Sequence, residues 1–303
     1  MRVLERVWRP ARPVDVTATL GVHRRGARDP AYRIMPDGAA WRTCRTADGP
    51  ATVRVTRRDE DVCATAWGGG AAAALEAVPG WLGADDDPDA FSPTHPVLAQ
   101  AHRRHRGLLV GRTGLVLEAL VPAVLEQKVT GQEATRGWRA LLLRFGEPAP
   151  GPAPDGMRVV PTPRDWARIP SWEWHRAGVG PDRSRTVVQA ARLASRLEEV
   201  VGLPAAEADR RLRAVPGVGP WTAAEVRQRA LGDPDAVSVG DYNLPRLVAF
   251  SMAGEERADD ARMLELLQPY AGHRHRACLL LAHAGRMPPR RAPRAPIRDY
   301  RAI

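Results

Sequence analysis

The spacing of hydrophobic residues changes character about a third of the way along this chain of 303 residues. In the first part, segments rich in β-branched residues predict strands at residues 14–22, 41–45, 51–56 and 61–67. Turn sequences at residues 36–38 and 48–50 separate the later strands. A helix is expected near residues 70–77, and the acidic, proline-rich segment 85–96 is expected to be a loop or a domain boundary.

From about residue 97 onward, apolar residues recur at i, i+3 and i+4, which is typical of amphipathic helices. This spacing predicts helices at residues 115–126, 131–144, 164–169, 185–200, 205–215, 222–231, 244–252, 259–267 and 274–283. The proline-rich stretch 148–154 predicts a linker between two of them. We therefore expect an α+β fold, with a small antiparallel-sheet domain at residues 1–84 and an all-helical domain at residues 85–303.

The net charge of +10 favours a polyanionic partner, of which nucleic acid is the simplest. Of the 45 lysines and arginines, however, only Lys128 is a lysine. The excess could equally reflect a compositional bias in which many arginines are simply solvated. Charge alone therefore gives only weak support for DNA binding.

The three cysteines, Cys44, Cys63 and Cys278, lie far apart. No two of them form a C-x-x-C pair, which excludes a zinc ribbon or a cysteine-ligated iron–sulfur cluster. The odd number of cysteines suggests that the protein resides in a reducing cytoplasm. No run approaches 18 apolar residues, so no membrane span is expected. Residues 1–13 carry charge and proline instead of an apolar core, so we expect no signal peptide.

The stretch VPGVGPWTAA at residues 215–224 places a glycine-rich turn between two predicted helices. Gly217 and Gly219 can adopt positive φ and have no Cβ that would keep another molecule away. The backbone N–H groups of this turn, with the following helix N-terminus, can then face a phosphate of a DNA strand. On this turn alone, a plain αα-hairpin with a glycine corner is an equally good explanation.

The residues around the turn favour DNA. VPGVGPWTAAE resembles the helix–hairpin–helix of the DNA glycosylase superfamily, and SVGDYNLPRL (238–247) resembles that family's catalytic aspartate segment. Further segments that fit the same family are residues 120–148, 161–169 and 273–285. The chain resembles in particular the bacterial inducible 3-methyladenine DNA glycosylases. This implies a TATA-binding-protein-like N-terminal domain and two helical lobes, one with the hairpin at about 115–231 and one made of about 85–114 and 232–303.

The resemblance implies that Asp241, 20 residues after Trp221, is the catalytic carboxylate. A glycosylase flips the damaged nucleotide out of the duplex before it acts. Breaking the bond between base and sugar leaves positive charge on the sugar, so a carboxylate beneath the ring lowers the barrier and can orient the attacking water. The alternative is that Asp241 only caps the helix predicted at 244–252, and it could do both.

Trp221, Glu225 and Tyr242 are the base-pocket residues that the resemblance implies. An indole face attracts a purine that carries positive charge after methylation, although Trp221 could equally be a core residue. Glu225 stands where relatives have an aromatic pocket wall and would change which bases are accepted, or it could be a solvent-facing helix residue. The family's second pocket tryptophan falls near Ala284, so a more open pocket is expected.

The family resemblance also implies which residues contact DNA: Gly217, Val218, Gly219 and Thr222 in the hairpin, and Gln127 and Lys128 at the minor-groove wedge. Relatives often have an apolar wedge, so Lys128 could instead pair with a phosphate or lie flat across the gap. Glycosylases that also cut the strand use an amine to form a Schiff base with the sugar. Where related enzymes have that lysine, this chain has Trp221. We therefore expect a monofunctional enzyme that leaves the strand intact.

The histidine-rich stretches 102–106 and 273–276 are expected to be basic, facing phosphate or solvent rather than a metal, because neither has acidic or cysteine companions. Asp233 and Asp235 flank a proline in a turn and are expected to be solvated. No cofactor is expected, except that a monovalent cation could sit at the hairpin carbonyls, as in the family. The basic stretch 286–303 could add nonspecific affinity for DNA.

Three functions remain open. The first is a monofunctional DNA glycosylase for alkylated purines of the 3-methyladenine or 7-methylguanine type, acting in base excision repair as a monomer. Its partner would be double-stranded DNA with damaged bases in the bacterial cytoplasm, with no membrane or obligate protein partner. The others are a noncatalytic helix–hairpin–helix protein and a glycosylase for oxidised or deaminated bases. The presence of both Asp241 and Trp221 favours an enzyme, because a protein that only binds DNA needs neither residue.

Overall fold

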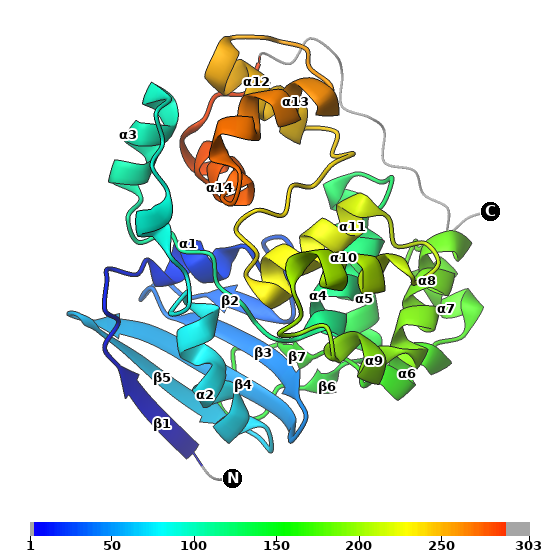
Figure 1. Cartoon of the computed structure of the whole chain (residues 1–303). Coiled ribbons are helices and arrows are strands. Elements are labelled where there is room, and N and C mark those ends of the chain that lie inside the picture. The colour runs from blue at the N-terminus through cyan, green and yellow to red at the C-terminus, as the bar shows by residue number, and fades with distance from the viewer. Residues whose placement is uncertain (1–2, 289–303) are drawn as a thin grey trace.

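The computed structural model describes residues 3–288 and begins with a five-stranded sheet (Figure 1). Its strands are β1 (Val3–Trp8), β2 (Tyr32–Ile34), β3 (Ala40–Thr46), β4 (Gly49–Arg58) and β5 (Asp61–Trp67). Every neighbouring pair is antiparallel, in the order β1-β5-β4-β3-β2. Helices α1 (Val16–Gly21) and α2 (Ala71–Trp81) pack against the sheet and share one apolar core with it.

The prediction of a strand at residues 14–22 is wrong, because this segment contains helix α1. The Asp15 side chain accepts a hydrogen bond from the Ala18 N–H (2.9 Å) and caps the helix. Val16 and Leu20, four residues apart, are then buried on one side. The cap and this burial outweigh the β preference of the valines and threonines. Sequence reasoning also missed β1 and β2, the two edge strands.

The rest of the described chain is mainly helical. Its longer elements are α3 (Pro96–Arg104), α4 (Val116–Leu125), α5 (Gly131–Phe145), α6 (Pro163–Arg168), α7 (Ser171–Arg176), α8 (Pro181–Arg192), α9 (Ala194–Glu198), α10 (Ala205–Arg213), α11 (Pro220–Val226), α12 (Leu244–Ala253), α13 (Asp260–Leu267) and α14 (Arg274–Ala284). Short helical turns are η1 (Pro88–Ala90), η2 (Arg227–Leu231) and η3 (Gln268–Tyr270), and strands β6 (Glu147–Pro148) and β7 (Arg158–Val159) form a small hairpin.

Most predicted helices are present, with three differences. The helix predicted at 185–200 is two helices, α8 and α9, and the one predicted at 222–231 is α11 followed by the π-helical turn η2. Helices α3 and α7 were not predicted. The proline-rich linker expected at 148–154 begins within the β6–β7 hairpin.

The helices form two apolar cores. One gathers α4 to α11, and the other gathers α3 with α12, α13 and α14. Figure 1 shows the two groups side by side, with the segment after η2 running from one to the other. We call this segment, residues 232–243, the connection. The α+β fold class is thus confirmed, whereas the boundary at residues 84 and 85 stays a prediction.

None of the helices within residues 3–288 has both the length and the apolar character needed to cross a membrane. The basic stretch expected at 286–303 lies, from residue 289 on, outside the described residues.

Candidate active site

The glycine-rich turn lies between α10 and α11, as the sequence predicts. Gly217 has φ +87°, and a Cβ added there would overlap the Thr186 hydroxyl, so both its backbone and its surroundings require glycine. Gly219 differs, because its φ is −95° and a Cβ there would have no described atom within 4 Å. The expectation of positive φ therefore holds for Gly217 only. Gly219 leaves open space where another molecule could approach the backbone.

Gln127 joins the turn between α4 and α5 to the glycine-rich turn. Its Nε2 donates to the Gly217 carbonyl oxygen (3.0 Å) and to the Thr222 Oγ1 (2.8 Å). Thr222 and Val218 are buried. Lys128 is exposed and has φ +54°, a left-handed conformation that is uncommon outside glycine. The residues predicted to form the wedge and those predicted to grip DNA are therefore neighbours in space.

The Asp241 carboxylate lies against the Trp221 indole. Trp221 Nε1 donates to Asp241 Oδ2 (3.1 Å), which joins α11 to the connection. Asp241 Oδ1 accepts from the backbone N–H groups of Asn243 (2.8 Å) and Leu244 (2.9 Å), at the start of α12. Asp241 thus binds the start of α12, although Asn243 and not Asp241 is the N-cap residue, and the indole holds the same carboxylate beside the hairpin.

Glu225, one helical turn after Trp221, is buried rather than solvent-facing. Its carboxylate accepts from Arg229 Nη1 (2.7 Å) and from Ser238 Oγ (2.7 Å). Gln228 Nε2 also donates to Ser238 Oγ (2.9 Å). The interpretation of Glu225 as an exposed helix residue is therefore wrong, because the side chain is buried and accepts from one donor of η2 and one of the connection.

The charge of Glu225 follows from its neighbours. Burial raises the pKa of Glu225, but its favourable contacts, led by Arg229, the Ser238 hydroxyl and Arg25, outweigh burial and lower the pKa overall. Glu225 is therefore ionised at neutral pH and acts only as a hydrogen-bond acceptor. Burial and the nearby Arg229 lower the pKa of His275 to about 4, so that imidazole is neutral.

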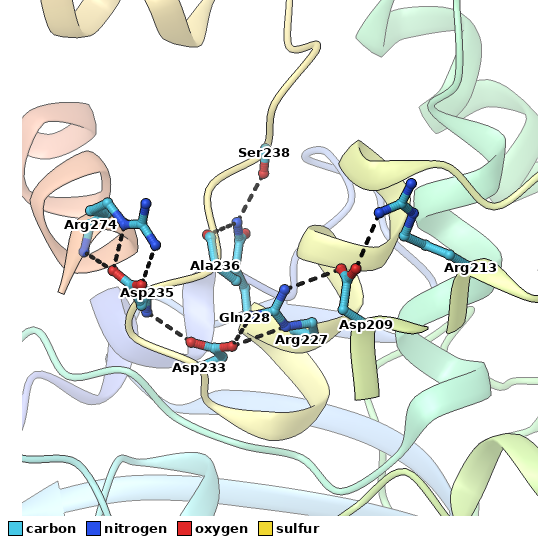
Figure 2. A network of polar contacts seen from close by, with 9 residues as sticks. All are labelled: Asp209, Arg213, Arg227, Gln228, Asp233, Asp235, Ala236, Ser238 and Arg274. Carbon is cyan, nitrogen blue, oxygen red and sulfur yellow. Dashed lines mark hydrogen bonds and ion pairs between the residues drawn. The ribbon is translucent and has the colours of Figure 1, made fainter. Parts of the chain in front are cut away.

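Two ion pairs at the beginning of the connection join it to both helical cores (Figure 2). Asp233 accepts from Arg227 Nε (3.0 Å) on the hairpin side. Asp235 accepts from the backbone N–H (3.0 Å) and Nε (2.8 Å) of Arg274, at the start of α14. Both carboxylates were expected to be solvated, and that expectation is wrong. They hold the connection between the two helical cores and so fix the chain that leads to Asp241.

The stretch 273–276 is also less exposed than expected. Arg276 is buried and pairs with Asp86, and Arg274 pairs with Asp235. These arginines are committed to internal contacts, so the expectation of a phosphate-facing or solvated stretch is wrong there. In the other stretch, 102–106, the arginines are exposed. Within residues 3–288, no three histidine, cysteine, aspartate or glutamate side chains are grouped so that they could hold a metal ion.

The remaining predicted pocket residues lie at the margin of this site. Tyr242 is 83% exposed, so in the free protein its ring extends into solvent. Ala284, where the family's second tryptophan was expected, is the last residue of α14. Sequence reasoning missed Arg229 and Ser238. The Glu225–Arg229 pair has the i, i+4 spacing of a helical ion pair and could have been found from it, whereas nothing local pointed to Ser238.

No family model matches the chain. Over 175 residues it is 32% identical to the probable bifunctional transcriptional activator/DNA repair enzyme AlkA of Mycobacterium tuberculosis, in strains CDC 1551 and H37Rv. The match covers 55% of this chain and 34% of each relative, so the chain spans about a third of the length of the curated relatives that it matches.

Solved structures share the fold over almost the whole chain. The 3-methyladenine DNA-glycosylase of Archaeoglobus fulgidus superposes with a TM-score of 0.75 and 18% identity, covering 92% of this chain and 98% of that one. The 8-oxoguanine glycosylase/lyase of Clostridium acetobutylicum in its apo form superposes with a TM-score of 0.69 and 12% identity. This match covers 93% of this chain and 98% of that one. The resemblance noted from the turn and the aspartate segment is thus confirmed, and the chain has the fold of helix–hairpin–helix DNA glycosylases.

Proposed function

We propose that this protein is a DNA glycosylase that hydrolyses the bond between a damaged base and its deoxyribose. The observation that carries this proposal is the Trp221–Asp241 hydrogen bond (3.1 Å), because it holds a carboxylate at the edge of an aromatic ring directly behind the hairpin. A protein that only grips DNA needs no such pair. The relationship to a DNA repair enzyme over 55% of the chain supports the same reading.

In this proposal the glycine-rich turn binds the DNA backbone, and the turn that carries Gln127 and Lys128 enters the minor groove as the damaged nucleotide leaves the stack. The role of Asp241 follows from its contacts. Two backbone N–H groups fix Oδ1 and one indole N–H fixes Oδ2, so the carboxylate has a defined orientation, and within residues 3–288 it forms no ion pair. It can stabilise positive charge on the sugar and orient the attacking water.

The finer specificity belongs to the same proposal. We propose alkylated purines as substrates, because the curated relative is named AlkA and a solved structure of the same fold is a 3-methyladenine glycosylase. An indole face favours the positive charge of such bases. The reaction would leave the strand intact, since Trp221 stands where lyases have their lysine. No cofactor is required, and the substrate would be chromosomal DNA in the bacterial cytoplasm.

A glycosylase for oxidised bases is the second candidate. A solved structure of the same fold is an 8-oxoguanine glycosylase/lyase. In this chain the charged Glu225 stands one helical turn from Trp221, where an aromatic wall was expected. A polar group there suits a base that is read by hydrogen bonds.

The experiment compares wild type with Asp241→Asn on DNA containing methylated purines, hypoxanthine or 8-oxoguanine. We expect wild type to release methylated purines and to cut the strand only after alkali treatment. Asp241→Asn should lower release by about 100- to 1,000-fold, because the anion beneath the sugar is lost, while DNA binding in a gel-shift assay is retained.

Asp259→Asn is the matched control, because Asp259 also binds the start of a helix with its carboxylate, accepting from the Arg262 N–H (2.9 Å), but has no contact with Trp221. It should lose about 1 kcal/mol of stability and keep full activity. Release that survives Asp241→Asn would overturn the proposal. Release of 8-oxoguanine alone would favour the second candidate, and direct strand cutting would contradict the monofunctional assignment.

A further inference from the structure

Helix α11 and the connection run alongside each other and are joined at two levels. At the first level, Trp221 donates to Asp241 (3.1 Å). At the second level, Ser238 donates to Glu225 (2.7 Å). Trp221 and Glu225 are four residues apart, which is about one helical turn or roughly 5.4 Å along the axis. The site therefore has two carboxylates at different depths, one touching the indole and one a turn beyond it.

The inference rests on the function proposed above. If the sugar lies at Asp241 and the base packs against the Trp221 indole, the edge of the base far from the sugar would point along α11 toward Glu225. Glu225 is buried, and its side chain keeps 11% exposure. Glu225 is then the group that reads the far edge of the base.

The carboxylate retains hydrogen-bonding capacity. An ionised carboxylate has about four acceptor positions on its two oxygens. Arg229 uses one position on Oε2 and the Ser238 hydroxyl uses one on Oε1, which leaves acceptor capacity on each oxygen. The same two contacts fix the plane of the carboxylate. A ligand with two adjacent donors can therefore bind both oxygens without breaking either contact.

We propose that Glu225 selects guanine lesions over adenine lesions. The Watson–Crick edge of guanine carries two adjacent donors, the N1–H and the N2 amine, which fit the two oxygens of one carboxylate. The corresponding edge of adenine has one donor, the N6 amine, beside the N1 lone pair, which would face a carboxylate oxygen and be repelled. Within alkylated purines the substrate class is thus the 7-methylguanine type, with hypoxanthine, which has N1–H alone, bound less well than guanine.

The test measures release of 7-methylguanine and of 3-methyladenine from methylated DNA, each as a rate enhancement over its spontaneous loss. Wild type should favour 7-methylguanine by about tenfold or more, the range of a good bidentate contact. Glu225→Gln should lower this ratio by about tenfold or more, because an amide offers one donor and one acceptor and so suits adenine.

The matched control is Glu118→Gln. Glu118 is also a largely buried glutamate paired with an arginine, accepting from Arg42 Nη2 (2.6 Å), but its partners come from β3 rather than from η2 or the connection. It should lose stability and keep the wild-type ratio. If Glu225→Gln does not fold, as judged by circular dichroism, Glu225→Asp takes its place and should keep the preference for guanine at a lower rate.

The outcomes separate this inference from the proposed function. An equal or greater enhancement for 3-methyladenine in wild type overturns the inference, as does an unchanged ratio in Glu225→Gln or a lost preference in Glu225→Asp, while Asp241-dependent release still supports the glycosylase. Absence of Asp241-dependent release from any methylated DNA means that the proposed function itself has failed.

Discussion

Two turns meet at the candidate site, and they use the left-handed backbone in different ways. In the glycine-rich turn, Gly217 has φ +87° and the Thr186 side chain fills the space where a Cβ would lie. In the turn between α4 and α5, Lys128 has φ +54°, but its side chain is exposed. The first turn uses glycine because there is no room for another residue. The second turn accepts the strain of a non-glycine residue and presents a long cationic side chain beside the hairpin.

The difference between the two turns shows where backbone strain is tolerated and what role it has. A left-handed conformation costs a non-glycine residue about 1–2 kcal/mol, and such strain collects at functional sites. Here Gln127, the residue before Lys128, is bonded to both the Gly217 carbonyl and the Thr222 hydroxyl. These bonds fix the second turn on the first, so the strained residue keeps its position.

The largest expected effect comes from closing the space in the first turn. Gly217→Ala should destabilise the protein by about 2–4 kcal/mol in urea unfolding, because the added methyl group overlaps Thr186 and the residue is left-handed. Gly219→Ala is the control, since it has φ −95° and open space. It should unfold like wild type but bind DNA more weakly. Equal destabilisation by both substitutions would contradict the packing explanation.

Cutting the link between the turns should have a smaller effect. Gln127→Ala removes two hydrogen bonds, to the Gly217 carbonyl oxygen and to the Thr222 hydroxyl, and should lower stability by about 1–2 kcal/mol. Amide hydrogen exchange should then be faster in both turns, and the rate of base release should decrease as well. Faster exchange in one turn alone would show that the two are not coupled.

The smallest change in stability, and one of opposite sign, is expected at the exposed turn. Lys128→Gly should stabilise the protein by up to about 1 kcal/mol, because glycine adopts positive φ without strain. It should also weaken DNA binding and reduce the slope of log K against log salt by about 0.9, the contribution of one phosphate contact. Lys128→Arg should keep the slope. Unaltered DNA binding by Lys128→Gly would mean that the strain serves no function in DNA binding.

Local patterns predicted the elements around the site well and their contacts poorly. The apolar spacing gave the helices on both sides of the hairpin, and the interval from Trp221 to Asp241 gave the pair that the hydrogen bond joins. The same approach failed at residues 14–22, where the Asp15 cap and burial against the sheet decided for a helix. It also left Asp233 and Asp235 in solvent, because their arginine partners come from other elements.

The sequence by itself indicated the hairpin, and its resemblance to a known family predicted Asp241 as the carboxylate and Trp221 where related lyases have a lysine, since each depends on residue type and on spacing along one segment. Only the tertiary structure decided that Glu225 is buried and charged, that Ser238 lies against it, and that Gln127 ties two turns together. The i, i+4 spacing of Glu225 and Arg229 indicates their ion pair, but burial depends on which distant segments exclude water from a side chain. Burial is therefore set by the packing of the whole chain.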